Sequence, residues 1–320
     1  MGEFELIRRY FQRPPPVGSA VVLGVGDDCA LLQPSPGHQL AISSDMLVEG
    51  RHFFPDVDPE ALGHKALAVN LSDLAAMGAR PLGFTLAIAL PQADEAWLAA
   101  LARGLFALAD ASACPLVGGD TTRGPLNLCI TVFGEVLPGR ALRRGAARAD
   151  DGLYLSGRTG EARLALELLR GGDWPGRLDA ALRARLERPT PRNALGQALA
   201  ATAGVHAAID VSDGLVGDLD HILRASGVGA EILLEDLPVA PALQALPEAQ
   251  RLACLLAGGD DYELLFTAAP EAHPAVLAAA AASGTSVTRI GRITASAGLK
   301  LLDAARREVP FTPQGFDHFA

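Results

Sequence analysis

Short apolar or β-branched runs alternate along the chain with longer stretches whose apolar residues recur at helical spacing. In the first half, this pattern predicts strands over residues 21–23, 39–42, 82–90 and 126–136 and helices over 59–78 and 94–112. In the second half, it predicts strands over 153–156, 207–210, 230–234, 262–267 and 286–293 and helices over 161–170, 192–203, 214–226 and 271–282. The alternation indicates two domains of similar size that each combine strands with helices.

A polar stretch without clear periodicity separates the two halves. Residues 138–152 hold a Pro-Gly pair and four arginines, which is typical of a linker. At 320 residues, the chain also exceeds the roughly 250 to 300 residues at which a single core stops growing. We therefore predict an N-terminal α/β domain over residues 1–137, the linker, and a C-terminal α/β domain over 153–320.

The composition restricts the classes of partner and the compartment. A formal net charge of -10 argues against a general nucleic-acid or anionic-membrane binder, which would be basic. The first residues lack the apolar segment of a secretory signal, and no later run of about 18 apolar residues predicts a membrane span. The four cysteines have no zinc or disulfide spacing, so we expect reduced thiols in a cytoplasmic protein.

Five short segments rich in Gly and Asp place carboxylates where the pattern predicts turns. Acids gathered in this way repel one another unless cations neutralise them, and hard divalent cations with oxygen ligands are the usual solution. The sequence therefore predicts a magnesium and phosphate site built from residues 24–28, 43–45, 118–120, 210–214 and 258–261.

Each segment taken alone has a simpler interpretation. Gly-Asp turns are common, a double glycine is a weak sign of phosphate binding, and Ser and Asp are preferred helix N-caps. However, segments 43–45 and 210–214 each follow a predicted strand. The carboxyl ends of strands are where α/β folds usually place ligands, which favours a shared site.

Asp73 is a sixth candidate, inside an apolar predicted helix. It shares one face with Leu62, Ala66 and Val69 through spacings of four and three residues. An ionised carboxylate on such a face is costly unless it pairs with a charge or a metal. A metal ligand and a salt bridge to Lys65 or Arg80 both satisfy this requirement.

Clustered carboxylates that hold several Mg²⁺ ions beside glycine turns suit phosphoryl transfer, where catalysis is mostly positioning and charge neutralisation. The nearest cationic candidates are arginines that a linker would ordinarily leave solvated: Arg123, Arg143, Arg144 and Arg148. The chain lacks both the P-loop motif and the protein-kinase motifs. A kinase with this sequence would have a different fold.

Six strings in a fixed order carry a resemblance to a known family: GVGDDCALL, SSDMLVEGRHF, HKALAVNLSDLAAMGARP, GGDTTRGPL, AIDVSDGL and GGDDYELLF. Together they resemble the thiamine-monophosphate kinase family, in the superfamily of aminoimidazole ribonucleotide synthetase and selenophosphate synthetase. The resemblance runs from about Gly2 to Phe319. It implies an α+β, two-domain architecture: an N-terminal mixed-sheet domain that forms a homodimer, and a C-terminal α/β domain of the aminoimidazole ribonucleotide synthetase-like type.

The resemblance also implies a reaction and residue roles. The reaction is transfer of the ATP γ-phosphoryl group to thiamine monophosphate, giving thiamine diphosphate and ADP. The implied magnesium ligands are Asp28, Ser43, Ser44, Asp45, Asp73, Asp120, Asp210 and Asp213. The implied ATP contacts are Gly119, Asp120, Arg144 and Ser212, and the implied contacts with thiamine monophosphate are His52, Asp260 and Phe316.

Three positions depart from the family pattern. Ser44 replaces a frequent Thr and keeps the hydroxyl, whereas Phe316 replaces Tyr or Trp and offers only a ring face to the cationic substrate. Asp260 replaces Glu and is one methylene shorter, so Asp261 or Glu263 could share its contact.

In the reaction implied by the resemblance, side chains have to supply charge, directly or through bound metal ions, and no proton transfer. The accepting phosphate is already anionic near pH 7, because its second pKa is about 6, so no general base is required and transfer can be direct and in line. Two other functions stay open: another ATP-dependent enzyme of the superfamily, such as aminoimidazole ribonucleotide synthetase, and a non-catalytic divalent-cation binder.

Overall fold

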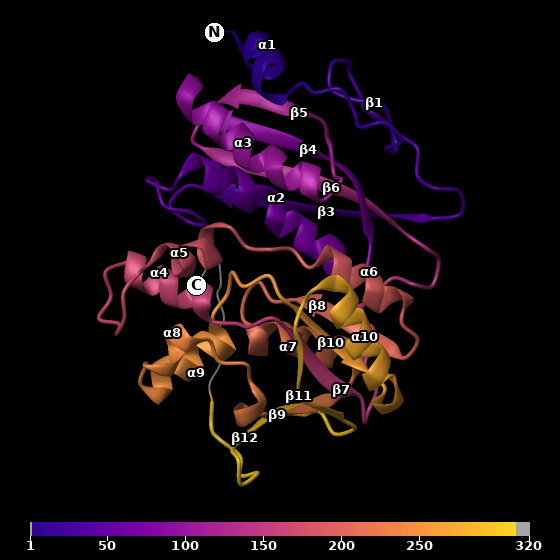
Figure 1. The fold of residues 1–320 in the computed structure, drawn as a ribbon, viewed down its shortest axis with the longest axis vertical. Helices are drawn as coiled ribbons and strands as arrows, with labels where there is room; N and C mark the ends of the chain where they lie inside the picture. Colours follow the sequence, from indigo (N-terminus) through magenta and orange to yellow (C-terminus); the bar gives the residue numbers. More distant parts are fainter. Residues whose placement is uncertain (1, 312–320) are drawn as a thin grey trace. The chain divides into compact units, whose positions relative to one another are not determined.

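The computed structural model describes residues 2–311 (Figure 1). The chain divides into two compact units, and the boundary falls between Gly139 and Arg140. The short segment Ala75–Gly78 belongs to the second unit by its contacts. Each unit has its own sheet and its own helices.

The first unit begins with a helix and a small hairpin and continues as a layered α/β structure. Its helices are α1 (Glu3–Leu6), which continues as the π-helical turn η1 (Ile7–Phe11), α2 (Pro59–Ala76) and α3 (Glu95–Ala111). Its strands are β1 (Val21–Leu23), β2 (Leu31–Leu32), β3 (Gln39–Val48), β4 (Arg80–Leu90), β5 (Leu116–Arg123) and β6 (Asn127–Val136).

The main sheet of this unit is mixed and has the order β3-β6-β4-β5 (Figure 1). β6 pairs antiparallel with both β3 and β4, whereas β4 and β5 are parallel. Leu128, Ile130 and Val132 of β6 are buried at every second position. They line the face on which α2 lies, since side chains alternate between the two faces of a strand.

The opposite face of this sheet exposes apolar side chains. Leu40, Ile42 and Met46 of β3 are 52%, 60% and 53% exposed, and they alternate with partly buried residues. β3 is also an edge strand. The face that these three residues line is called the open face below.

Two predicted turns lie inside strands in the structure. β3 does not end at Ile42 but continues to Val48, because all ten of its residues pair with β6. Gly118-Gly119-Asp120 lies within β5, where parallel pairing with β4 overrides the local preference of glycines for turns. The Gly-Asp segments are thus not all loops.

The second unit contains one six-stranded sheet and helices on both of its faces. Its strands are β7 (Gly152–Ser156), β8 (Val205–Asp210), β9 (Gly229–Leu233), β10 (Leu264–Ala268), β11 (Val287–Thr294) and β12 (Gly298–Leu302). Its longer helices are α4 (Glu161–Leu169), α5 (Ala180–Glu187), α6 (Asn193–Ala201), α7 (Leu215–Ser226), α9 (Glu248–Ala257) and α10 (His273–Ser283). The shorter turns are η2 (Arg144–Ala146), η3 (Leu234–Asp236), α8 (Pro241–Gln244) and η4 (Pro270–Ala272).

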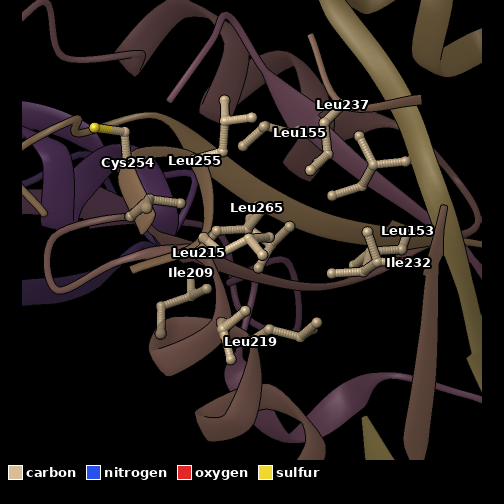
Figure 2. Packing of buried hydrophobic residues seen from close by; sticks show 14 of the residues in the cluster. Leu153, Leu155, Ile209, Leu215, Leu219, Ile232, Leu237, Cys254, Leu255 and Leu265 are labelled. Atoms are coloured by element: carbon tan, nitrogen blue, oxygen red, sulfur yellow. The ribbon is translucent and has the colours of Figure 1, made fainter. Parts of the chain in front are cut away.

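This sheet has the order β12-β9-β11-β7-β10-β8, and every neighbouring pair is antiparallel except β12 and β9. Leu153 and Leu155 of β7 face a core with Leu215 and Leu219 of α7 (Figure 2). Tyr154, between them, faces the other core, which α6 and α10 cover. Burial on both faces explains why the central strands β7 and β10, all of whose residues are buried, are nearly continuously apolar in sequence.

Within residues 2–311, no helix is long and apolar enough to cross a membrane. The four cysteines are free thiols, as expected, and two of them, Cys114 and Cys254, are buried. Burial raises the pKa of each of these two thiols to about 12, so neither is a reactive thiolate near pH 7.

Candidate active site

Two predicted magnesium ligands meet where β3 lies against α2, and a third lies on the same face of β3. The hydroxyl of Ser43 donates a hydrogen bond of 2.5 Å to Oδ2 of Asp73. Asp45, two residues further along β3, points to the same face of the sheet, and its main-chain N–H donates to Oδ1 of Asn70 at 3.0 Å. Arg80, which the sequence offered as a salt-bridge partner for Asp73, forms a salt bridge with Glu135. The helical and strand periodicities therefore join Ser43 to Asp73 and place Asp45 on the same face of the sheet.

Ser44 and Asp120 are separated from this group in two different ways: Ser44 is on the same strand but faces the other side of the sheet, and Asp120 is on another strand. Ser44 points to the open face, where its hydroxyl donates to the carbonyl oxygen of Ile130 at 3.1 Å and lies 3.0 Å from the hydroxyl of Thr131. Asp120 is exposed on β5, the opposite edge strand, about 14 Å or three strand spacings from β3. Within one chain, the structure does not bring Asp120 to Asp45.

Gly119, beside Asp120, has a main-chain conformation that requires glycine. Its φ is +143°, and a Cβ atom there would lie 1.8 Å from the carbonyl oxygen of Leu86 in β4. The position therefore brings bare main chain to the edge of the sheet, which is how glycines let an anion approach closely.

The remaining candidates of the first unit lie outside the main strands. Asp28 is exposed between β1 and β2, and its N–H donates to the carboxylate of Asp27 at 2.8 Å. His52 lies in the turn after β3, where its Nδ1 accepts the N–H of Val48 at 2.9 Å. In a neutral ring, this bond places the proton on Nε2.

In the second unit, the predicted segment 210–214 forms the end of β8 and the turn into α7. Asp210 is the buried last residue of β8, Ser212 is partly buried and Asp213 is exposed. The N–H groups of Ser212, Asp213 and Gly214 all donate to one oxygen, Oδ2 of Asp218, at 3.0, 3.1 and 3.1 Å. This turn therefore has a fixed main-chain shape.

The segment 258–263 pairs with that turn. The N–H of Asp260 donates to the carbonyl oxygen of Ser212, the N–H of Tyr262 donates to that of Val211, and the N–H of Val211 donates to that of Glu263, each at 2.8 Å. Asp260 and Tyr262 have φ angles of 65° and 52°, which non-glycine residues seldom adopt. Strained conformations of this kind concentrate at functional sites.

The acids around Asp260 are held by internal donors. Both carboxylate oxygens of Asp261 accept the N–H of Gly160, at 3.0 and 2.9 Å. Glu263 is fully buried and accepts from Ser156 at 2.5 Å and from Nε and a terminal nitrogen of Arg192 at 2.7 and 2.5 Å. Asp260 is only partly buried, and its Oδ1 accepts the hydroxyl of Tyr262 at 3.1 Å.

Burial shapes the electrostatics of the second unit. It raises the pKa of Asp218 to about 6, although the three N–H donors act in the opposite direction. Burial also raises the pKa of Asp261 well above its usual value, against the hydrogen bond from Gly160 and the charge of Arg185. Both carboxylates accept hydrogen bonds from main-chain N–H groups. The sequence analysis did not identify Asp218, although it lies four residues after Gly214, which precedes α7.

One ATP candidate, Arg144, has its main chain away from the turn that carries Ser212. The main chain of Arg144 lies beside the end of α7, where its carbonyl oxygen accepts the hydroxyl of Ser226 at 2.9 Å. Ser212 lies just before the start of α7, at the opposite end of this helix from Arg144. Because the helix rises 1.5 Å per residue, Ser212 and the main chain of Arg144 lie about 17 Å apart. Phe316 lies outside the described residues.

The donor set fits magnesium. In residues 2–311, no three His, Cys, Asp or Glu side chains gather closely enough to enclose an ion by themselves. Mg²⁺ usually keeps several waters and takes only one or two carboxylates, so Asp45, Asp73 and the hydroxyl of Ser43 form an adequate oxygen set. The 2.5 Å contact between Ser43 and Asp73 shows that two of these oxygens already converge.

Comparison with known proteins supports the family resemblance along most of the chain. Two family models match: AIR synthase related protein, N-terminal domain, over residues 26–136, and AIR synthase related protein, C-terminal domain, over residues 148–304. The thiamine-monophosphate kinase of Salmonella typhimurium is 46% identical over 330 residues, with 100% of this chain and 98% of that protein covered.

Solved structures agree with this similarity. The thiamine-monophosphate kinase of Stenotrophomonas maltophilia K279a superimposes with a TM-score of 0.83 and 46% identity, covering 89% of this chain and 92% of that chain. AaThiL complexed with AMPPCP and TMP superimposes with a TM-score of 0.76 and 30% identity, covering 89% of each chain.

Proposed function

The chain belongs to the thiamine-monophosphate kinase family, and from this premise we propose that it transfers the ATP γ-phosphoryl group to thiamine monophosphate, giving thiamine diphosphate and ADP. The full-length identity of 46% to a protein of that name carries the proposal. The complex of AaThiL with AMPPCP and TMP supports both ligands, because that chain covers 89% of this one.

The magnesium ligands come from several separate parts of the structure. Ser43, Asp45 and Asp73 form the first group, and Ser44 and Asp120 lie on the strands of the same sheet as separate ligands. Asp28 adds a carboxylate from the hairpin loop, and Asp210 and Asp213 add two from the second unit. Bound Mg²⁺ would neutralise the charge between the two phosphate-bearing substrates.

The ATP contacts are Gly119, Asp120, Arg144 and Ser212, and the contacts with thiamine monophosphate are His52, Asp260 and Phe316. The hydrogen bonds favour Asp260 over its neighbours as the acid that contacts the substrate. Asp261 and Glu263 are buried and direct their oxygens to Gly160, Ser156 and Arg192. Asp260, which precedes both of these anchored acids in the chain, is partly exposed.

No side chain is needed as a general base. The accepting phosphate oxygen is anionic near pH 7, because the second phosphate pKa is about 6. His52 fits a different role: with Nδ1 accepting the N–H of Val48, its Nε2–H is a donor suited to the anionic phosphate of thiamine monophosphate. The residues therefore position the two substrates for direct in-line transfer.

We also propose a homodimer in the cytoplasm. The open face carries Leu40, Ile42 and Met46, each more than half exposed, and a second copy of the sheet would cover them. The reduced thiols and the acidic composition agree with a cytoplasmic enzyme of small-molecule metabolism.

The deciding experiment measures ADP production by the purified protein with ATP and Mg²⁺, with and without thiamine monophosphate. We expect thiamine monophosphate to stimulate ADP release. Stimulation by formylglycinamidine ribonucleotide instead would support the aminoimidazole ribonucleotide synthetase reaction. Metal binding without any nucleotide turnover would support a non-catalytic cation binder.

A pair of variants tests the metal assignment in the same assay. Asp45→Asn keeps the size of the side chain but removes its charge, so we expect turnover to be lost at every magnesium concentration while the melting temperature stays near that of the parent. Asp56→Asn is the matched control, because Asp56 is exposed in the same unit. Near-parental rates for Asp45→Asn would remove Asp45 from the site.

A further inference from the structure

Asp218 has an unusual arrangement in the second unit. It lies in the first turns of α7, is only 2% exposed, and directs a single carboxylate oxygen at three successive main-chain N–H groups. Leu215 and Leu219 of the same helix are fully buried in the core (Figure 2), which fixes the rotation of α7 and hence the direction of Asp218.

Three successive N–H groups that point at one spot form a concave anion site, of the kind that binds phosphate in many enzymes. Here the protein's own carboxylate fills that site. The N–H groups of Ser212, Asp213 and Gly214 are each within 3.1 Å of Oδ2 of Asp218. A phosphate at this turn would therefore be bound by the hydroxyl of Ser212 and, through magnesium, by the carboxylate of Asp213, and not by these main-chain N–H groups.

The turn is fixed from its other side as well. Gly214 has a φ of +121°, and a Cβ atom there would lie within 3.0 Å of the main chain of Ala257. The carbonyl oxygen of Ser212 accepts the N–H of Asp260 at 2.8 Å. A change in the turn would therefore also displace the residue assigned to the substrate.

We infer that Asp218 is a positioning residue for magnesium-bound ATP: its carboxylate holds the 212–214 turn so that Ser212 and Asp213 keep the directions in which they bind the nucleotide and metal. This inference rests on the proposed function. It adds a residue that touches neither substrate, and it assigns nucleotide binding at this turn to side chains.

The test compares Asp218→Asn and Asp218→Ala with Asp220→Asn. Asparagine keeps the volume and one acceptor oxygen but loses the charge, and charge-assisted hydrogen bonds are about twice as strong as neutral ones. Asp220, two residues further along α7, pairs with Arg224 and is 43% exposed, so its variant is the control. Calorimetric titration with AMPPCP in Mg²⁺ measures binding, and steady-state kinetics separates KM for ATP from kcat.

We expect the Kd of AMPPCP and the KM of ATP to rise about tenfold in Asp218→Asn and further in Asp218→Ala, with Asp220→Asn unchanged. A merely structural Asp218 would lower the melting temperature and leave both constants within twofold of the parent, and this outcome overturns the inference. If Asp218→Ala does not fold, Asp218→Asn decides. Failure of the proposed function would be visible in the parent protein, which would then bind AMPPCP without any thiamine monophosphate-dependent turnover.

Discussion

The hydroxyl of Ser43 and the carboxylate of Asp73 are joined by a hydrogen bond of 2.5 Å that links β3 to α2. The bond connects residues 30 positions apart in the sequence, and it orients the carboxylate on the same face of the sheet as Asp45. Metal affinity in the first unit should therefore depend on Ser43, both as a ligand and as the partner that orients Asp73.

Ser43→Ala should raise the magnesium concentration needed for half-maximal activity by about tenfold, since hydrogen bonds to charged groups contribute about 1.5–3 kcal/mol. A magnesium titration of the ADP assay measures this change. Ser112→Ala, at the C-terminal end of α3, is the control. An unchanged magnesium dependence for Ser43→Ala would show that its hydroxyl neither binds the metal nor orients Asp73 during turnover.

Asp260→Asn should raise KM for thiamine monophosphate about tenfold and leave KM for ATP near its parental value. The reason is that Asp260 is the partly exposed acid of its segment, and loss of one charged contact with the cationic ring of the substrate costs about 1.4 kcal/mol or more. Steady-state kinetics with each substrate varied in turn measures both constants. Equal increases in KM for thiamine monophosphate and KM for ATP would show that Asp260 supports the structure of the whole site and does not contact one substrate.

Glu135 predicts a pH dependence of stability. It is 3% exposed and accepts from Ser35 at 2.7 and 2.8 Å and from Arg80. Burial alone would raise its pKa, but the hydrogen bonds from Ser35 and Arg80 together lower the pKa below its usual 4.5. The folded state therefore holds this proton less tightly than the unfolded state, so the stabilisation is present above the unfolded pKa and is lost as the pH falls through the folded pKa.

Glu135→Gln should accordingly reduce the free energy of unfolding by roughly 1–3 kcal/mol at pH 7, and the deficit should shrink below about pH 4. Urea unfolding at several pH values measures this difference. Glu248→Gln, an exposed residue of the second unit, should show no such trend. A deficit that does not change between pH 7 and pH 3 would mean that the charge of Glu135 contributes nothing.

Ile42→Asp should convert the protein from dimer to monomer, because it places a charge in the centre of the open face. Sedimentation velocity at micromolar concentration distinguishes the two states. Leu277→Asp is the control, since Leu277 is 45% exposed on α10 in the second unit. A parent protein that sediments only as a monomer would contradict the proposed dimer.

Residues with a clear periodicity were predictable, and residues whose structure depends on distant pairing were not. The apolar helix around Asp73 runs over Pro59–Ala76, close to its predicted span of 59–78. The strand that carries Ser43 and Asp45 was predicted to end at residue 42, because two serines and an aspartate resemble a turn. Pairing of each of these residues with β6 extends the strand instead.

The same limit applies to the candidate site. Motif order identified the acids, but spacing could not show that Ser43 and Ser44 point to opposite faces, since that follows only once both are known to lie inside a strand. Asp218, Arg192 and Arg185 were missed because their roles depend on partners 4 to 78 residues away: the turn before α7 for Asp218, and Glu263 for the two arginines. The helices α5 and α9 were missed as well.

The main-chain bonds between residues 211–212 and 260–263 have an evolutionary consequence. They make one rigid piece of two segments that lie about 50 positions apart, one assigned to the metal and one to the acceptor. A substitution that reshapes the acceptor segment would shift the metal-binding turn with it. Changing the preferred acceptor in this scaffold should therefore require compensating changes around Ser212, so that new specificity arises by coordinated replacement of both segments.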